Sequence, residues 1–106
     1  MSVLARVPVV AGLAYIERVR HLPRTFTATL SVEPGNRYFR HAIVVSSDTG
    51  KVGYVAPEIA GRYYDTVRVA TTPISCPARR GSSADHETSG VELFVDLTGL
   101  PTSESE

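Results

Sequence analysis

The most regular segment of the chain reads Thr25-Phe26-Thr27-Ala28-Thr29-Leu30-Ser31-Val32. Apolar side chains alternate in it with Thr and Ser, and successive side chains of a β-strand point to opposite faces. The period of two, together with the many β-branched residues, predicts a half-buried strand over 25–32. Pro34-Gly35-Asn36 follows as a turn, because proline fixes φ and glycine or asparagine tolerates positive φ.

Other segments on either side carry strand chemistry as well. The run 42–46 is apolar, 47–50 reads as a turn, and 51–55 is its expected hairpin partner. Further strands are expected at 7–16, which is apolar, at 67–74, which is rich in Val and Thr, and at 91–97, which alternates.

One short helix is expected from Pro57 to Asp65 or a little beyond. Pro57 suits a first helical turn, Glu58 complements the positive end of the helix dipole, and apolar or aromatic residues recur at positions 59, 60, 63 and 64. Short strands with a single short helix predict a mainly β fold, a small OB-like and partly open six-stranded barrel.

The chain of 106 residues has room for one modest core, so residues 1–97 are expected to form a single domain. Segment 77–90 is dominated by small and polar residues and is expected to be a mobile loop. Residues 98–106 are polar and acidic and are expected to form a flexible tail.

The composition of the chain bears on its cellular location. No apolar run approaches the roughly 18 residues of a membrane-spanning helix, so we expect no membrane partner. The apolar run after Arg6 is broken by Gly12 and leads into Glu17 without a cleavage site for a signal peptide. The single Cys76 cannot form an internal disulfide. These features predict an intracellular protein, cytoplasmic or, in a eukaryote, nuclear.

Charges balance over the whole chain but not locally. Eleven basic residues face eleven acidic ones, which argues against a strongly basic nucleic-acid binder. The part of the chain before Pro57 is nevertheless basic: its acids are Glu17, Glu33 and Asp48, and its bases are Arg6, Arg18, Arg20, Arg24, Arg37, Arg40 and Lys51. A basic half can support a local positive patch even when the total charge is zero.

Three stretches of the sequence, taken in order, are similar to the motifs of a known family. The first is Val10-Ala11-Gly12-Leu13-Ala14-Tyr15, and the second is Glu33-Pro34-Gly35-Asn36-Arg37-Tyr38-Phe39-Arg40-His41-Ala42-Ile43-Val44. The third is Gly50-Lys51-Val52-Gly53-Tyr54-Val55-Ala56-Pro57-Glu58-Ile59-Ala60. In this order they resemble the motifs of the HIRAN family, which has a strand with a glycine and then an aromatic, then Glu-Pro-x-Asn-Pro-Tyr-Asp-x-Asn-Ala-Ile-x-Val, then Gly-x-x-Ile-Gly-Tyr-Ile-x-x-Glu-Ile-Ala. The resemblance covers roughly residues 7–65. It implies an OB-like barrel that, in members attached to helicase-like ATPases, grips the 3′ end of single-stranded DNA.

The resemblance also implies site residues. By position Tyr15 matches the first aromatic and Tyr38 the loop tyrosine, both of which stack on bases, and Tyr54 falls where the family often has an aromatic or a histidine. Binding of single strands needs flat aromatic faces for bases and cations for the backbone. The candidate nucleic-acid contacts are Tyr15, Arg37, Tyr38, Phe39, Arg40, Lys51 and Tyr54. The alternative for the tyrosines is packing inside the barrel, and for the arginines a solvated surface.

Two positions depart from the family pattern. Phe39 stands where the family has an aspartate that receives the terminal hydroxyl, and a phenyl ring cannot accept that hydrogen bond. Ala14 stands where end-binding members carry an arginine. These departures, with the zero net charge, give the alternative function: a protein-interaction or targeting module that has lost recognition of the 3′ end and accepts a partner strand at an open barrel edge.

Nothing in the sequence assembles a catalytic or metal site. The histidines at 21, 41 and 86 are scattered, and Cys76 with His86 lacks two further zinc ligands. Gly50-Lys51-Val52-Gly53 is not a phosphate-binding loop of the Walker type. We therefore expect no enzyme, no metal and no cofactor. The expected function is binding of single-stranded DNA, in preference to RNA, with a helicase-like ATPase or nuclease chain as a further partner.

Overall fold

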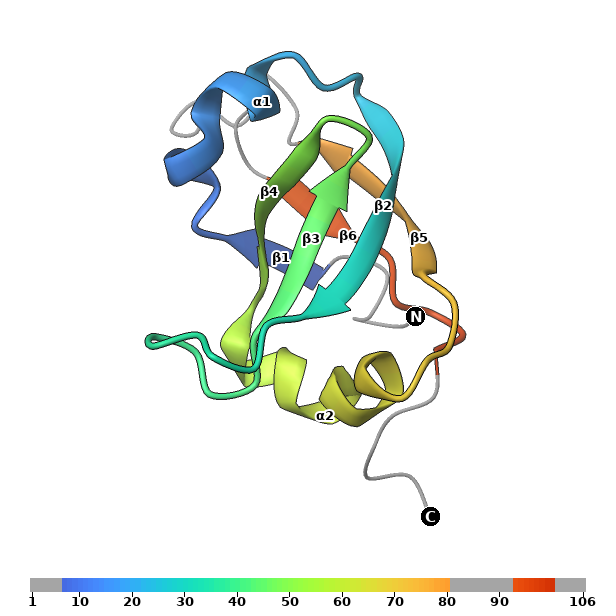
Figure 1. Ribbon diagram of the computed structural model, residues 1–106. Coiled ribbons are helices and arrows are strands. Elements are labelled where there is room, and N and C mark those ends of the chain that lie inside the picture. Colours follow the sequence, from blue (N-terminus) through green and yellow to red (C-terminus); the bar gives the residue numbers. More distant parts are fainter. Residues whose placement is uncertain (1–6, 81–92, 101–106) are drawn as a thin grey trace.

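The computed structural model describes residues 7–80 and 93–100 as a barrel of six antiparallel strands with helices at its two ends (Figure 1). The strands are β1 (Val7–Val10), β2 (Thr25–Val32), β3 (Ile43–Ser47), β4 (Gly50–Val55), β5 (Ile74–Arg80) and β6 (Leu93–Val95). This confirms the mainly β fold and is consistent with a small OB-like barrel. The barrel is closed where the sequence predicts a partly open one, because β1 pairs with both β4 and β6.

The alternation in β2 has the predicted consequence. Its apolar side chains at 26, 28, 30 and 32 face inward, and Ala28 and Leu30 are fully buried. The same period holds near the end of the chain, where Leu93, Val95 and Leu97 are buried. Val91, which the sequence assigns to the same face, lies outside the described residues.

Residues 7–80 and 93–100 contain three helical segments, whereas the sequence predicts one helix. The predicted helix is α2 (Pro57–Arg68), which has proline in its first turn. The prediction of a strand over 67–74 is wrong for its first part, because Val67 lies one helical turn after Tyr63 and continues the same buried stripe. The strand that follows, β5, begins only at Ile74.

The predicted strand over 7–16 is also too long. β1 ends at Val10, Ala11 adopts a positive φ of 66°, and the chain continues as the 3-10 helix η2 (Gly12–Tyr15) and α1 (Ile16–Arg20). Val19 and the following Leu22 are buried in the main core, so the segment covers one end of the barrel while α2 covers the other (Figure 1). Tertiary burial thus outweighs the local strand preference of this segment.

The predicted loop 77–90 is wrong at its start. Residues 77–80 belong to β5, and 77–79 pair with Thr25 to Thr27 of β2. The remainder of the predicted loop lies outside the described residues. Of the predicted tail, the structure describes residues 98–100. Within the described ranges no helix is long and apolar enough to cross a membrane.

Closure of the barrel brings β1 and β4 unusually close together at one glycine. A Cβ on Gly53 would lie 2.5 Å from Cγ1 of Val9 and 2.7 Å from the carbonyl oxygen of Val10. Only glycine fits this close backbone approach. The Gly53 of the third motif therefore serves the packing of the barrel wall.

A second, small core cluster lies on the outer side of β3 and β4. Strand alternation sends Ile43 and Val45 into the barrel, and Val44 between them outward. Val44 and Ala42 pack with Tyr54, and the half-buried Val10 and Phe39 cover them. This cluster supports the loop between β2 and β3 and thereby positions the candidate site.

Candidate functional site

The connection between β2 and β3, residues 33–42, is shaped by one asparagine side chain. Oδ1 of Asn36 accepts hydrogen bonds from the backbone N–H groups of Tyr38 and Phe39, both at 2.7 Å. Its Nδ2 donates to Oε1 of Glu33 at 3.0 Å, and its backbone N–H donates to the Glu33 carbonyl at 3.1 Å. These bonds hold the backbone on both sides of Arg37 in one arrangement.

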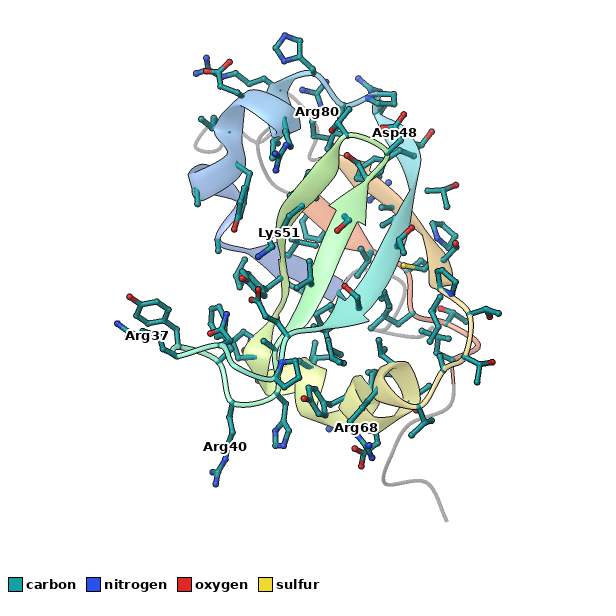
Figure 2. The ribbon with its side chains drawn as sticks, viewed as in Figure 1. Arg37, Arg40, Asp48, Lys51, Arg68 and Arg80 are labelled. Atoms are coloured by element: carbon teal, nitrogen blue, oxygen red, sulfur yellow. The ribbon has the colours of Figure 1, made fainter. Side chains whose placement is uncertain are left out.

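Tyr38 stands at the tip of this loop and is 81% exposed. Arg37 and Arg40 on either side of it are exposed as well, and both extend away from the barrel (Figure 2). The loop therefore exposes an aromatic ring and two guanidinium groups, and Arg37 and Arg40 point in different directions (Figure 2).

Phe39, the neighbour of Tyr38, has a different environment. It is half-buried, and its ring centroid lies 5.2 Å from that of Tyr54 at an angle of 48°. Such a tilted aromatic contact fixes the loop on the barrel wall. Phe39, which the sequence places among the candidate nucleic-acid contacts, therefore also anchors the loop.

Three polar side chains form a hydrogen-bonded triad where the loop meets the barrel: Glu33 at the start of the loop, and Lys51 and Tyr54 on β4. The Tyr54 hydroxyl donates to Oε1 of Glu33 at 2.5 Å. Lys51 Nζ donates to Oε2 of Glu33 at 3.1 Å and to the Tyr54 hydroxyl at 3.0 Å. The triad joins the start of the loop to β4.

These contacts shift the titration of all three groups. The hydrogen bond from Tyr54, followed by those from Asn36 and Lys51, lowers the pKa of Glu33 to about 2. The hydrogen bonds to Tyr54 and Glu33 raise the pKa of Lys51, and the bond to Glu33 together with burial raises the pKa of Tyr54. At neutral pH the triad is therefore an anion, a cation and a neutral phenol.

The triad contains two of the predicted nucleic-acid contacts. Tyr54, predicted as a nucleic-acid contact, is only 8% exposed, because its ring belongs to the outer core cluster. Its ring supports the loop through its contact with Phe39. Lys51, predicted to neutralise phosphates, has its charge paired with Glu33, and its side chain is 29% exposed. A paired lysine attracts a further anion less strongly than an unpaired one does.

Tyr15 lies at the end of η2 and is half-buried. Lys51 Nζ is 5.9 Å and the guanidinium carbon of Arg18 is 6.0 Å from its ring centroid. Arg18 Nη1 also donates to the carbonyl oxygen of Lys51 at 2.8 Å. Lys51 therefore contacts Tyr54 within the triad and Tyr15 outside it, and links these two predicted site residues through one side chain.

Sequence reasoning missed Glu33, Asn36 and Arg18. Glu33 and Asn36 are three residues apart in the second motif, and this spacing at the Pro-Gly-Asn turn is the signal that was available. Arg18 is adjacent to no motif residue in sequence, and only the fold of η2 and α1 brings it to β4.

A separate hollow of about 860 Å³ lies on the outer side of β2, β5 and β6, and its lining includes Thr27, Pro77, Arg79 and Asp96. It contains none of the predicted site residues. Within 7–80 and 93–100, no three His, Cys, Asp or Glu side chains are grouped to hold a metal ion, and Cys76 is buried with its pKa raised to about 11 by burial.

Comparisons of the chain with models of known protein families, with curated proteins and with solved structures find no match.

Proposed function

We propose that the chain is a divergent member of the HIRAN family that binds single-stranded nucleic acid, DNA in preference to RNA. The observation that carries the proposal is the loop tip, where Tyr38 is 81% exposed between the exposed Arg37 and Arg40. The order of the three HIRAN-like motifs supports the family assignment. The role is one of binding and not of catalysis, with a helicase-like ATPase or nuclease as the chain that it would serve.

The chemistry of the loop tip suits a single strand. A base stacked on the Tyr38 ring contributes about 1–3 kcal/mol, whatever its sequence. Arg37 and Arg40 neutralise the phosphates next to that base, and each such contact makes the affinity depend on salt. Asn36 holds the backbone of the loop in place through two hydrogen bonds, so little ordering of the loop is needed when a strand binds.

Recognition of the 3′ end of the bound nucleic acid needs a separate group in the loop, one that accepts a hydrogen bond from the terminal hydroxyl. Glu33 is the acidic residue of segment 33–42, and its carboxylate already accepts hydrogen bonds from three side chains. With Phe39 in place of an aspartate, Glu33 is the one carboxylate of the loop, and its hydrogen bonds to Asn36, Lys51 and Tyr54 compete with a terminal hydroxyl. We therefore expect strands ending in a 3′-hydroxyl or a 3′-phosphate to bind equally well.

The test is fluorescence anisotropy of a labelled oligothymidine strand at low and moderate salt. Tyr38→Ala should weaken binding roughly 5- to 100-fold at each salt concentration, as expected from the loss of one stacked base. Arg40→Ala should mainly reduce the slope of log affinity against log salt, by about 0.7 for one phosphate on a single strand. Val69→Ala, at a residue that is 62% exposed at the end of α2, and Arg68→Ala on α2 are the matched controls and should change neither quantity.

Two results would contradict the proposal. One is the absence of salt-dependent binding by the unaltered protein. The other is an equal loss of affinity in Tyr38→Ala and in its control. Strong preference for the 3′-hydroxyl strand would instead restore recognition of DNA ends. The alternative of a protein-interaction module is motivated by Phe39, Ala14 and the zero net charge. It would need a docking mode other than strand addition at an open edge, because each of the six described strands has a partner on both sides.

A further inference from the structure

One end of the barrel carries an arginine cluster that none of the three motifs includes. It consists of Arg20, Arg24, Arg79 and Arg80. Arg80 Nη1 donates to the carbonyl oxygen of Arg20 at 3.4 Å, and the Arg80 backbone N–H donates to the carbonyl oxygen of Arg24 at 2.9 Å. Arg79 pairs with Thr25, the residue after Arg24, across β2 and β5. The fold thus gathers arginines from α1, from its connection to β2 and from the end of β5.

The arginine cluster is rich in positive charge that is open to solvent. Arg20, Arg24 and Arg79 are exposed, and Nε of Arg80 is buried with no hydrogen-bond partner in the described part of the chain. Arginines brought to one end of the barrel raise the positive potential there, and this potential attracts an anion. Planar guanidinium groups suit phosphate in particular, because they donate two parallel hydrogen bonds.

The arginine cluster is connected to the proposed site by residues that already contact one another. The Lys51 side chain contacts Glu33 at the start of the loop and also the Tyr15 ring of η2. Arg18 of α1 donates a hydrogen bond to the Lys51 carbonyl oxygen. Two residues further along α1 is Arg20 of the arginine cluster. In Figure 2, Lys51 lies between Arg37 and Arg40 at one end of the barrel and Arg80 at the other.

We propose that a single strand held at the loop tip continues past Tyr15 and Arg18, and that the arginine cluster binds its phosphates. This inference rests on the proposed function and extends it to a second contact region. The distance to be covered is about the length of the six residues of β4, roughly 20 Å at ~3.3 Å per residue. At ~3.4 Å per stacked nucleotide this corresponds to about six nucleotides, within the ~4–16 that a single OB fold covers.

The experiment compares a four-nucleotide with a ten-nucleotide thymidine strand, because only the longer one reaches both regions. The variant is Arg20→Ala/Arg24→Ala, at two exposed positions. The matched control is Arg62→Ala/Arg68→Ala, which removes the same charge from exposed positions of α2. Affinity is measured by anisotropy over a range of salt, and folding of each variant is checked by circular dichroism.

The expected result is a loss confined to the longer strand. Two fewer phosphate contacts lower its salt slope by about 1.4 and its affinity at about 0.1 M salt by up to roughly 25-fold. The control should bind both strands as the unaltered protein does. Equal affinity of Arg20→Ala/Arg24→Ala and the unaltered protein for the longer strand, or an equal loss for both strands, would overturn the inference while leaving the loop-tip proposal standing. Failure of the unaltered protein to bind either strand would overturn both.

Discussion

Replacing Tyr54 by phenylalanine isolates the hydrogen-bonded triad from the packing around it. Tyr54→Phe removes one oxygen atom and with it the bonds to Glu33 and Lys51, while the ring keeps its contacts with Phe39 and Val44. Hydrogen bonds to charged groups contribute about 1.5–3 kcal/mol each. The Glu33 and Lys51 side chains are 37% and 29% exposed, so water replaces part of what is lost. We expect the free energy of unfolding to fall by about 1–2 kcal/mol at neutral pH.

The loss in Tyr54→Phe should depend on pH in a defined way. The pKa of Glu33 is lowered in the folded state, so its contribution is present above pH 4.5 and is lost as the pH falls toward about 2. The pKa values of Tyr54 and Lys51 are raised, so their contributions are present below pH 10 and are lost above it. The difference between Tyr54→Phe and the unaltered protein should therefore be largest from about pH 5 to 9 and smaller at about pH 3.

Urea unfolding followed by circular dichroism, at about pH 7 and about pH 3, measures this difference. Tyr63→Phe is the comparison, because it removes the same atom from a hydroxyl that is buried without a hydrogen-bond partner among the described residues. Tyr63→Phe should leave stability unchanged or raise it by up to about 1 kcal/mol. Equal destabilisation by the two substitutions, or a loss in Tyr54→Phe that is the same at both pH values, would refute a stabilising role of the triad.

Three further outcomes follow from particular contacts. Gly53→Ala places a Cβ 2.5 Å from Val9 Cγ1 and 2.7 Å from the Val10 carbonyl oxygen, so the free energy of unfolding in urea should fall by about 3 kcal/mol or more. In Gly35→Ala the new Cβ meets nothing within 4 Å, so the free energy of unfolding should fall by under about 1 kcal/mol. A similar loss of stability in both variants would contradict the close approach of β1 and β4. Cys76 is 5% exposed and burial raises its pKa to about 11, so at mildly alkaline pH a thiol reagent should react with it only after unfolding, and prompt reaction in the folded protein would contradict that burial. Asn36→Ala removes the acceptor of two backbone N–H groups, so affinity for a thymidine strand should fall roughly 2- to 10-fold with an unchanged circular dichroism spectrum, and full affinity would show that the loop needs no fixing.

The β elements were predictable to the extent that their side chains alternate. In β2 and in the segment around Leu93, buried residues alternate with more accessible ones, and this period of two is visible in the sequence. The segment after Val10 was not predictable in this way. Its apolar residues suit a strand, and the helical turns there depend on burial of Val19 against residues far away in sequence.

The features of the candidate site are likewise of two kinds, those fixed by local sequence and those that depend on long-range contacts. The exposure of Tyr38 agrees with its place in a polar turn segment, where local sequence fixes the loop through Asn36. The pairing of Lys51 with Glu33 spans 18 residues, and the burial of Tyr54 depends on the bend of the loop that brings Phe39 over it. Such long-range contacts leave no periodic trace in a single sequence.

The shortness of β1 has a consequence for handling the protein. Four residues of β1 form the seam that joins β4 to β6. If this segment detached, two strands would lose a partner at once, and their free N–H and C=O groups would offer templates for swapped dimers or fibrils. Peptides or fusion tags that compete for the pairing positions of Val7 and Val9 are therefore expected to promote self-association of a barrel whose six described strands otherwise all have two partners.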